Sequence, residues 1–252
     1  MFRTASHTAL ILKSRPSGES NREVWLLTAE AGLIRATVFG GPKSRLRALA
    51  APFNSGRVWV YHDPVKDSRK ISDFDVQSWR PGLRELYERS MAAGAVAETV
   101  LASHGGGGHW EEVLSLAEAA LDALAEAGEE ACSRIPVFFY WRWAGFLGLD
   151  PSLDYCVACG GKSEDSAALW YSPRESGMVC GGCISAQRRE GEVSGFVFAG
   201  PGCRHWLKTV RPLDPSRIVR HTMDKKSFQE AKSLTTAILA EALGKRLSSW
   251  DW

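Results

Sequence analysis

The stretch TALILKSRPSGESNREVWLLTAEAGLIRATVF, residues 8–39, decides the start of the fold. It contains three short runs rich in β-branched and aromatic residues, and turn-forming residues separate them, first Pro16-Ser17-Gly18 and then Glu30-Ala31-Gly32. Such runs bounded by glycine and proline are typical of β-strands. The three predicted strands are Thr8–Lys13, Glu23–Thr28 and Leu33–Phe39.

Two further runs of the same kind, Arg57–His62 and Lys70–Trp79, follow a long basic connection that opens with Gly40-Gly41-Pro42. Five short strands at this spacing predict a small closed barrel, and an OB-fold and an SH3-like barrel are both compatible with them. The long segment between the third and fourth strands favours the OB-fold, which commonly has extra structure there.

From Leu83 onward the apolar residues recur at helical spacing, and Gly105–Gly108 and Gly128 divide the pattern. An aromatic-rich helix is predicted over Pro136–Leu149, because proline is favoured in a first helical turn. Its aromatic residues point to more than one side, so we expect it to be central and buried. A last helix is predicted to start with a capping box formed by Ser227 and Glu230.

Two Cys-x-x-Cys pairs, CVAC and CGGC, lie 20 residues apart. A Cys-x-x-Cys turn directs two thiolates at one point about 2.3 Å away, and two such turns complete a tetrahedron around zinc. Four reduced structural cysteines or two redox dithiols are the alternatives, but a thioredoxin-type motif belongs to a βαβ unit, which the sequence lacks. The sequence therefore predicts one structural Zn²⁺ bound by Cys156, Cys159, Cys180 and Cys183.

Catalytic chemistry finds little support in the sequence. His109-Trp110-Glu111 faintly resembles the His-x-Glu of zinc nucleobase deaminases, but that assignment would leave Cys180 and Cys183 without a role. The sequence contains no nucleophile elbow, phosphate-binding loop or dinucleotide fingerprint. We therefore expect no catalytic residues and no enzymatic activity.

These patterns together predict a multidomain α+β protein. The expected organisation is a basic, nucleic-acid-binding OB-fold over residues 1–80, then a helical domain over 81–252 with a zinc finger inserted at about 154–186. The longest apolar stretch, Val137–Leu149, contains Arg142 and two glycines, so neither a membrane span nor a signal peptide is expected. Two further cysteines, Cys132 and Cys203, fit a reducing compartment, which predicts a cytoplasmic protein.

The net charge of +2 conceals a segregation along the chain. Residues 1–80 contain 13 Lys and Arg against 7 Asp and Glu, whereas residues 81–155 contain 4 against 12. The cations of the barrel fall at strand ends or in the glycine-rich loop, where an OB-fold receives oligonucleotide. A solvated basic surface is the alternative. The candidate nucleic-acid-binding residues are Lys13, Arg15, Arg22, Arg35, Lys43, Arg45 and Arg47.

Two tryptophans of the predicted strands, Trp25 and Trp59, are candidates for stacking on bases. Core packing is the favoured interpretation of both, because no RNP-like aromatic signature accompanies them.

The whole chain resembles the RecO recombination mediator proteins of bacterial DNA repair. Ala9–Lys13 with Arg15–Arg22 is similar to that family's first hairpin, and Gly41–Arg47 is similar to its basic loop. Phe146–Gly160 resembles the junction between helix and zinc finger, and Ser176–Cys180 resembles the second half of the finger.

The resemblance implies an OB-fold, a helical domain and an inserted zinc finger. It further implies binding to single- and double-stranded DNA, annealing of complementary strands, and help in loading the RecA recombinase onto strands covered by single-strand-binding protein (SSB). The implied partners are RecR, the C-terminal tail of SSB and, indirectly, RecA, and the implied location is the nucleoid. For the acidic tail of SSB we expect cations of the last third, such as Arg204, Lys208, Arg211 or Arg217.

A function of another class also remains open. A zinc-ribbon adaptor would join proteins in transcription or repair through its finger, with the barrel as scaffold only. Annealing of complementary oligonucleotides separates the two interpretations, because an adaptor would not accelerate it.

Overall fold

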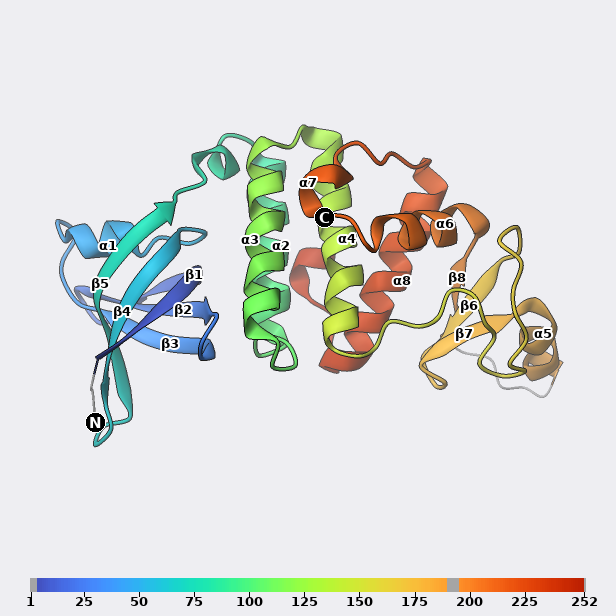
Figure 1. Cartoon of the computed structure of the whole chain (residues 1–252), viewed down its shortest axis with the longest axis horizontal. Coiled ribbons are helices and arrows are strands. Elements are labelled where there is room, and N and C mark those ends of the chain that lie inside the picture. The colour runs from blue at the N-terminus through green and yellow to red at the C-terminus, as the bar shows by residue number, and fades with distance from the viewer. Residues whose placement is uncertain (1–3, 190–194, 252) are drawn as a thin grey trace. The chain divides into compact units, whose positions relative to one another are not determined.

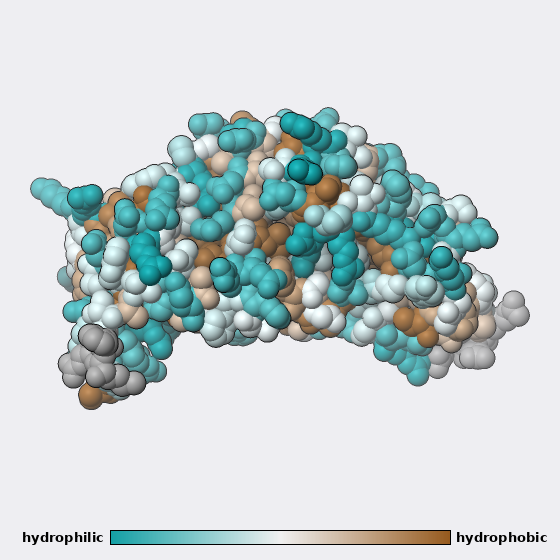
Figure 2. Space-filling view, viewed as in Figure 1, coloured by the Kyte–Doolittle hydropathy of each residue, from teal (hydrophilic) through white to brown (hydrophobic). Residues whose placement is uncertain are grey.

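The computed structural model describes residues 4–189 and 195–251 (Figure 1). The chain packs as two compact units, Met1–Glu129 and Glu130–Trp252. Hydrophilic residues cover most of the face shown in Figure 2, with small groups of hydrophobic residues between them. Within the described ranges no helix is both long and apolar enough to cross a membrane.

The first unit begins with a closed five-stranded barrel. Its strands are β1 (Thr4–Ser17), β2 (Asn21–Thr28), β3 (Gly32–Val38), β4 (Ser55–Asp63) and β5 (Ser68–Ser78). They are ordered β1-β2-β3-β5-β4 around the barrel, with β3 and β5 parallel and the other pairs antiparallel. The long connection between β3 and β4 contains the short helix α1 (Arg45–Leu49). This topology confirms the predicted OB-fold barrel.

Alternation along β2 builds two buried layers. Val24 and Leu26 point into the barrel core, whereas Leu27 faces the other way and is equally buried. Two helices, α2 (Tyr87–Ala102) and α3 (Trp110–Glu126), pack on this part of the barrel's outer face and follow the 3₁₀ turn Pro81–Arg84. At the end of β1–β3 that these helices cover, both faces of the sheet are buried. At the other end only the face toward the barrel core is buried.

Gly32, the first residue of β3, is required for two reasons. Its φ of +65° lies in the left-handed region, and a Cβ there would lie 2.7 Å from the Trp110 ring of α3. A side chain at this position would separate the helix from the barrel.

A β-bulge in β1 decides where its cations point. The β1–β2 register shifts between Ile11 and Lys13, so that Ile11 pairs with Leu26 and Lys13 with Trp25. In a regular strand without the bulge, alternation would direct Lys13 inward, as it does Ile11. The bulge instead directs Lys13 to the outer face.

Within the described residues, the second unit combines five helices with a small sheet. The sheet is ordered β7-β6-β8, and the aromatic helix α4 supplies much of the core. The elements are α4 (Glu129–Phe146), β6 (Leu169–Ser172), β7 (Gly177–Cys180), α5 (Gly181–Arg189), β8 (Val197–Ala199), α6 (Pro201–Val210), α7 (Pro215–Ile218), α8 (Lys225–Leu243) and the 3₁₀ turn Ser248–Asp251. Trp250 is buried edge-on against Tyr140, with ring centroids 6.1 Å apart, and Trp252 lies outside the described residues.

The prediction that Pro136 opens the aromatic helix is wrong. The helix begins seven residues earlier, at Glu129, and Pro136 lies inside it. Ala131, Cys132 and Ile135 are buried at helical spacing before the proline. Their burial compensates for the backbone hydrogen bond that a proline cannot donate.

The predicted capping box of the last helix is also wrong. Asp224 is the N-cap, and its carboxylate accepts a hydrogen bond from the Ser227 amide at 3.0 Å. The Glu230 carboxylate accepts instead from the Gly200 amide at 2.9 Å, which connects α8 to the start of α6. A tertiary partner thus takes the side chain that the local motif assigned to the cap.

Candidate nucleic-acid interface and metal centre

The structure divides the seven predicted basic residues into three groups. Lys13, Arg15 and Arg35 lie together on the open part of the outer face of β1–β3. Arg22 has the inward parity of Val24 and donates to Ser14 Oγ at the end of the barrel, 3.3 Å away. The remaining three, Lys43, Arg45 and Arg47, belong to the connection that contains α1.

Trp25 stands at the centre of the first group. Lys13 pairs in register with Trp25, and Trp25 pairs with Arg35, so the three side chains form one row across the sheet. The Lys13 Nζ and the Arg15 Cζ lie 5.7 Å and 4.9 Å from the centroid of the indole ring, within cation–π range. We call Lys13, Arg15, Trp25 and Arg35 the tryptophan face.

The favoured core role of Trp25 is therefore wrong. The core of the barrel contains its neighbours Val24 and Leu26, and the ring of Trp25 is half-buried on the opposite side. Trp59 is likewise half-buried and lies between core residues of β4, Val58 and Val60, on the outer side.

Glu23 connects the two arginines of this face. Its carboxylate accepts from Arg15 Nε at 2.6 Å and pairs with Arg35 Nε at 3.2 Å. The side chains of Arg15 and Arg35 are nevertheless 56% and 63% exposed, compared with 15% for Glu23. Ion pairs this accessible contribute little stability, so both guanidinium groups are free to exchange Glu23 for another anion.

Barrel closure adds two residues that the sequence did not single out. Lys70 of β5 pairs with Thr37 of β3 and with Tyr61 of β4, and its Nζ lies 4.7 Å from the centroid of the Tyr61 ring. This is a second contact between a cation and an aromatic ring on the outer side of the barrel. In the sequence, only the alternation of polar and apolar residues along β4 and β5 indicates that Lys70 and Tyr61 share the outer side, because the β3–β5 pairing joins segments far apart in the chain.

The cations around α1 have acidic neighbours. Ser44 caps the helix by accepting from the Arg47 amide at 3.4 Å. Arg45 lines a cavity of about 510 Å³ together with Trp59, Asp73 and Asp75. Because these carboxylates face the same space, the local positive field is weaker here than on the tryptophan face.

The four cysteines of the two Cys-x-x-Cys pairs lie together in the second unit. Their sulfur atoms are all within 4.8 Å of one another, and Cys159 Sγ lies 4.0 Å from Cys180 Sγ. Ideal tetrahedral zinc–thiolate geometry places sulfurs about 3.8 Å apart. In the described part of the chain, this is the one cluster of His, Cys, Asp or Glu side chains that could hold a metal ion, and all its members are cysteines. The donor set therefore fits a closed four-sulfur site.

Backbone geometry prepares this site for negative charge. Gly160 has a φ of +70°, and a Cβ on Gly161 would lie 3.3 Å from Cys159 Sγ, so both glycines let the turn close around the sulfurs. Burial alone would raise the pKa of Cys156, but amide donors, chiefly that of Cys180 at 3.3 Å, outweigh it and lower the pKa to about 6. Hydrogen bonds that the Cys183 thiol donates to neighbouring sulfurs, first that of Cys180 and then that of Cys159, raise the pKa of Cys183 to about 12. Without a cation, the four sulfurs cannot all ionise.

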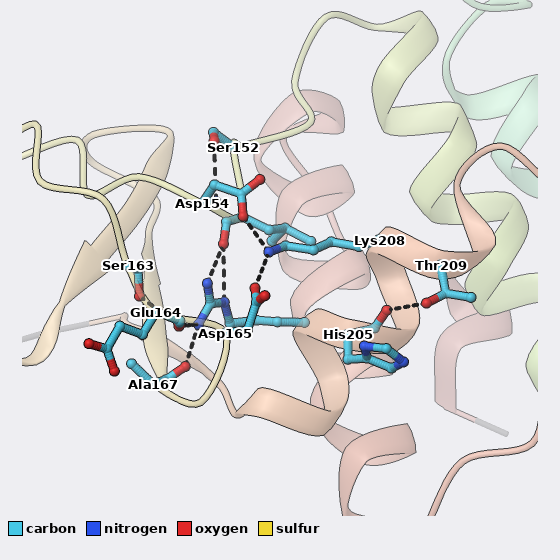
Figure 3. A network of polar contacts seen from close by, with 11 residues as sticks. Ser152, Asp154, Ser163, Glu164, Asp165, Ala167, His205, Lys208 and Thr209 are labelled. Atoms are coloured by element: carbon cyan, nitrogen blue, oxygen red, sulfur yellow. Dashed lines mark hydrogen bonds and ion pairs between the residues drawn. The ribbon is translucent and has the colours of Figure 1, made fainter.

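A polar network attaches the loop after Cys159 to helix α6 (Figure 3). Arg204 is 1% exposed, and its guanidinium donates to the carbonyls of Leu153, Glu164 and Ala167. Figure 3 shows Lys208 between two carboxylates: it contacts Asp154, and its Nζ lies 2.8 Å from Asp165 Oδ1. These contacts raise the pKa of Lys208, although burial acts in the opposite direction.

Three of the four cations suggested for the tail of SSB, namely Arg204, Lys208 and Arg211, have partners inside the unit, since Arg211 pairs with Asp150. Arg204 is inaccessible, and Lys208 lines a cavity of about 640 Å³ together with Asp154, Glu164 and Asp165. Three carboxylates against two lysines, Lys162 and Lys208, leave the lining of this cavity net negative, which disfavours an acidic peptide. The suggestion that Arg204 contacts such a peptide is wrong.

Comparison with known protein families covers almost the entire chain. The family model described as the recombination protein O N-terminal region matches residues 1–78, and the model of its C-terminal region matches residues 84–251. The chain belongs to the RecO family. Both halves of the family pattern occur in their expected order, so the barrel and the cysteine-containing unit are each parts of the RecO architecture.

Individual RecO relatives agree with this assignment. A DNA repair protein RecO of Rubrobacter xylanophilus is 32% identical over 70% of this chain and 70% of its own length. One from Desulfitobacterium hafniense is 29% identical over 96% of this chain and 86% of its own length, and one from Nocardioides sp. is 27% identical over 96% and 95%. The similarity thus extends over both units.

Proposed function

We propose that this chain is a DNA repair and recombination mediator that binds single- and double-stranded DNA and anneals complementary strands. The observation that carries the proposal is the tryptophan face, where three accessible cations surround a half-buried indole ring on an OB-fold barrel. Membership of the RecO family gives this surface its biological context.

Annealing requires a surface that reduces the repulsion between two phosphate backbones. Exposed Lys and Arg side chains do this by displacing counterions, without recognising a base sequence. The cations of the tryptophan face, Arg22 and the α1 connection (Lys43, Arg45 and Arg47) supply such contacts. No catalytic side chain is needed for this role, and we propose that the protein acts without enzymatic turnover.

We further propose that the four cysteines hold one Zn²⁺ ion as a brace of the second unit. Four thiolates leave no open coordination position for a substrate, and metal binding in such sites stabilises the fold. In this role the protein helps to load the RecA recombinase onto strands covered by SSB, with RecR as its partner. It is then a cytoplasmic protein associated with the nucleoid. Among the cations suggested for the SSB tail, Arg211 and Arg217 remain the candidates. Arg204 is buried and Lys208 is held between two carboxylates, whereas Arg211, although it pairs with Asp150, is 55% exposed.

Fluorescence annealing of two complementary oligonucleotides tests the proposal. The protein should accelerate pairing at low salt, and raising the salt concentration should abolish the acceleration, because phosphate contacts are salt-dependent. Acceleration that does not respond to salt, or no acceleration at all, would contradict it. A protein that fails to anneal but captures a repair or transcription protein through its cysteine unit would be an adaptor.

A further inference from the structure

The position of Trp25 is not explained by packing. Strand β2 already fills the barrel core with Val24 and Leu26, and its other outward residue near the helices, Leu27, is fully buried. Trp25 occupies the outward position at the part of the sheet that α2 and α3 leave open. The aromatic ring there lies beside Lys13 and Arg15 and pairs across the sheet with Arg35.

Aromatic rings on OB-folds can bind nucleic acid by stacking on bases, while adjacent cations contact the backbone. One such stack contributes roughly 5- to 100-fold in affinity per base. A base in a duplex is already stacked between its neighbours and presents only its edges in the grooves, so an indole ring on an open sheet cannot reach its π-face.

We propose that Trp25 stacks on an unpaired base and makes the tryptophan face selective for single-stranded DNA. Lys13, Arg15 and Arg35 then contact the phosphates on either side of that base. In the free protein the Arg15 guanidinium lies 4.9 Å from the ring centroid and is held by Glu23. On binding, the phosphate replaces Glu23 as the partner of Arg15, and the base replaces Arg15 over the ring.

Charge alone would not favour single strands, because a duplex has the higher charge density, and this distinguishes the inference from the proposed function on which it rests. The cations around α1 contact phosphates of either form, whereas the ring discriminates between them. Selectivity for single strands should therefore depend on residue 25 and not on the net charge of the barrel.

The test compares the variants Trp25→Ala and Trp25→Phe with a matched control, Trp79→Ala, which removes a 50% exposed tryptophan elsewhere in the first unit. The ligands are oligo(dT), an abasic oligonucleotide of equal length and a duplex of the same number of phosphates, measured by fluorescence anisotropy. Trp25→Ala should lose roughly tenfold on oligo(dT), while its affinity for the abasic strand and the duplex stays within twofold of the wild type. Trp25→Phe should keep most of the affinity, and Trp79→Ala all of it.

Each other outcome overturns the inference. An equal loss on all three ligands would show that Trp25 supports the fold or the charge arrangement, and an unchanged affinity for oligo(dT) would show that no base stacks there. If the wild-type protein binds none of the three ligands, the proposed function fails instead. Thermal unfolding of each variant identifies a loss that comes from misfolding.

Discussion

The chain uses arginine and lysine in two opposite ways. On the barrel, Arg15 and Arg35 are more than half exposed and share a single carboxylate beside an aromatic ring. In the cysteine-containing unit, Arg204 is almost completely buried, and Lys208 is held between two carboxylates. Equal formal charges thus give an accessible cationic surface in one region and an internal brace in the other.

The difference follows from the number of acceptors around each cation. A guanidinium with three carbonyl partners has no capacity left for a ligand, whereas one that shares an accessible carboxylate can exchange it for phosphate. The position of a cation in the sequence says nothing about this. Variants of both regions should therefore affect different properties, stability in one and DNA affinity in the other.

The largest effect is expected from loss of the metal. With Cys156→Ser the proposed zinc site loses one of its four ligands, and binding energy on the order of 10 kcal/mol no longer supports the fold. Metal analysis should show an empty protein, and hydrogen exchange should show residues 154–186 unfolding while β1–β5 stay protected. Cys132→Ala, a buried cysteine outside the cluster, is the control and should keep its metal. A stably folded, metal-free protein would contradict the bracing role.

Arg204→Met should have the next largest effect. The substitution leaves the carbonyls of Leu153, Glu164 and Ala167 without their donor in a buried position, which costs about 3 kcal/mol or more. Denaturant unfolding of the full chain measures this loss. The control Arg217→Met removes an exposed side chain and should change the free energy of unfolding by less than about 1 kcal/mol. A loss of DNA affinity in folded Arg204→Met protein would remove the distinction between the two regions.

Neutralising the tryptophan face should reduce DNA affinity with little effect on stability. Exchanging Lys13, Arg15 and Arg35 for Gln removes three phosphate contacts. At 0.1 M salt we expect about a 100-fold loss on single strands, and the slope of log affinity against log salt should fall by about 2.

The matched triple variant exchanges Lys43, Arg45 and Arg47 for Gln. Its loss should be smaller, because Asp73 and Asp75 already weaken the field around α1. If this variant loses more affinity than the first, the α1 connection is the main DNA contact and the tryptophan face is secondary. If charge reversal of its three cations leaves affinity unchanged, the connection contacts no phosphate.

The smallest expected effect is a gain. Glu23→Gln removes the carboxylate that competes with phosphate for Arg15 and Arg35, and affinity for oligo(dT) should rise by up to about fivefold. Glu30→Gln makes the same change of charge beside His7 and Arg57 and serves as the control. An equal gain in both variants would assign the effect to net charge rather than to release of the two arginines.

Local sequence patterns predicted much of this molecule, because strand alternation, cysteine spacing and helical periodicity are properties of short segments. The runs at residues 8–39 alternate as β-strands do, and all three lie in β1–β3. The cysteine spacing singled out four sulfurs that the fold brings within 4.8 Å of one another. The aromatic helix is buried, as its many-sided pattern indicated.

The predictions failed where tertiary packing decided the outcome. Glu230 accepts from Gly200 instead of closing a cap, and Pro136 lies inside a helix that earlier buried residues extend. Trp25 was assigned to the core, since the alternation of a strand does not say which of its two faces is inside. For Glu230 the competing partner, Gly200, lies outside the window that the local pattern covers.

The sequence by itself determined the element types, the barrel class and the set of basic residues, because periodicity, turn residues and charge are properties of short segments. Only the tertiary structure decided which cations remain accessible. A bulge in β1 turns Lys13 and Arg15 outward beside Trp25, and folding of the second unit surrounds Arg204 with three carbonyls. Whether a charge binds a ligand or stabilises the fold depends on the acceptors around it, and these come from segments far apart in the chain.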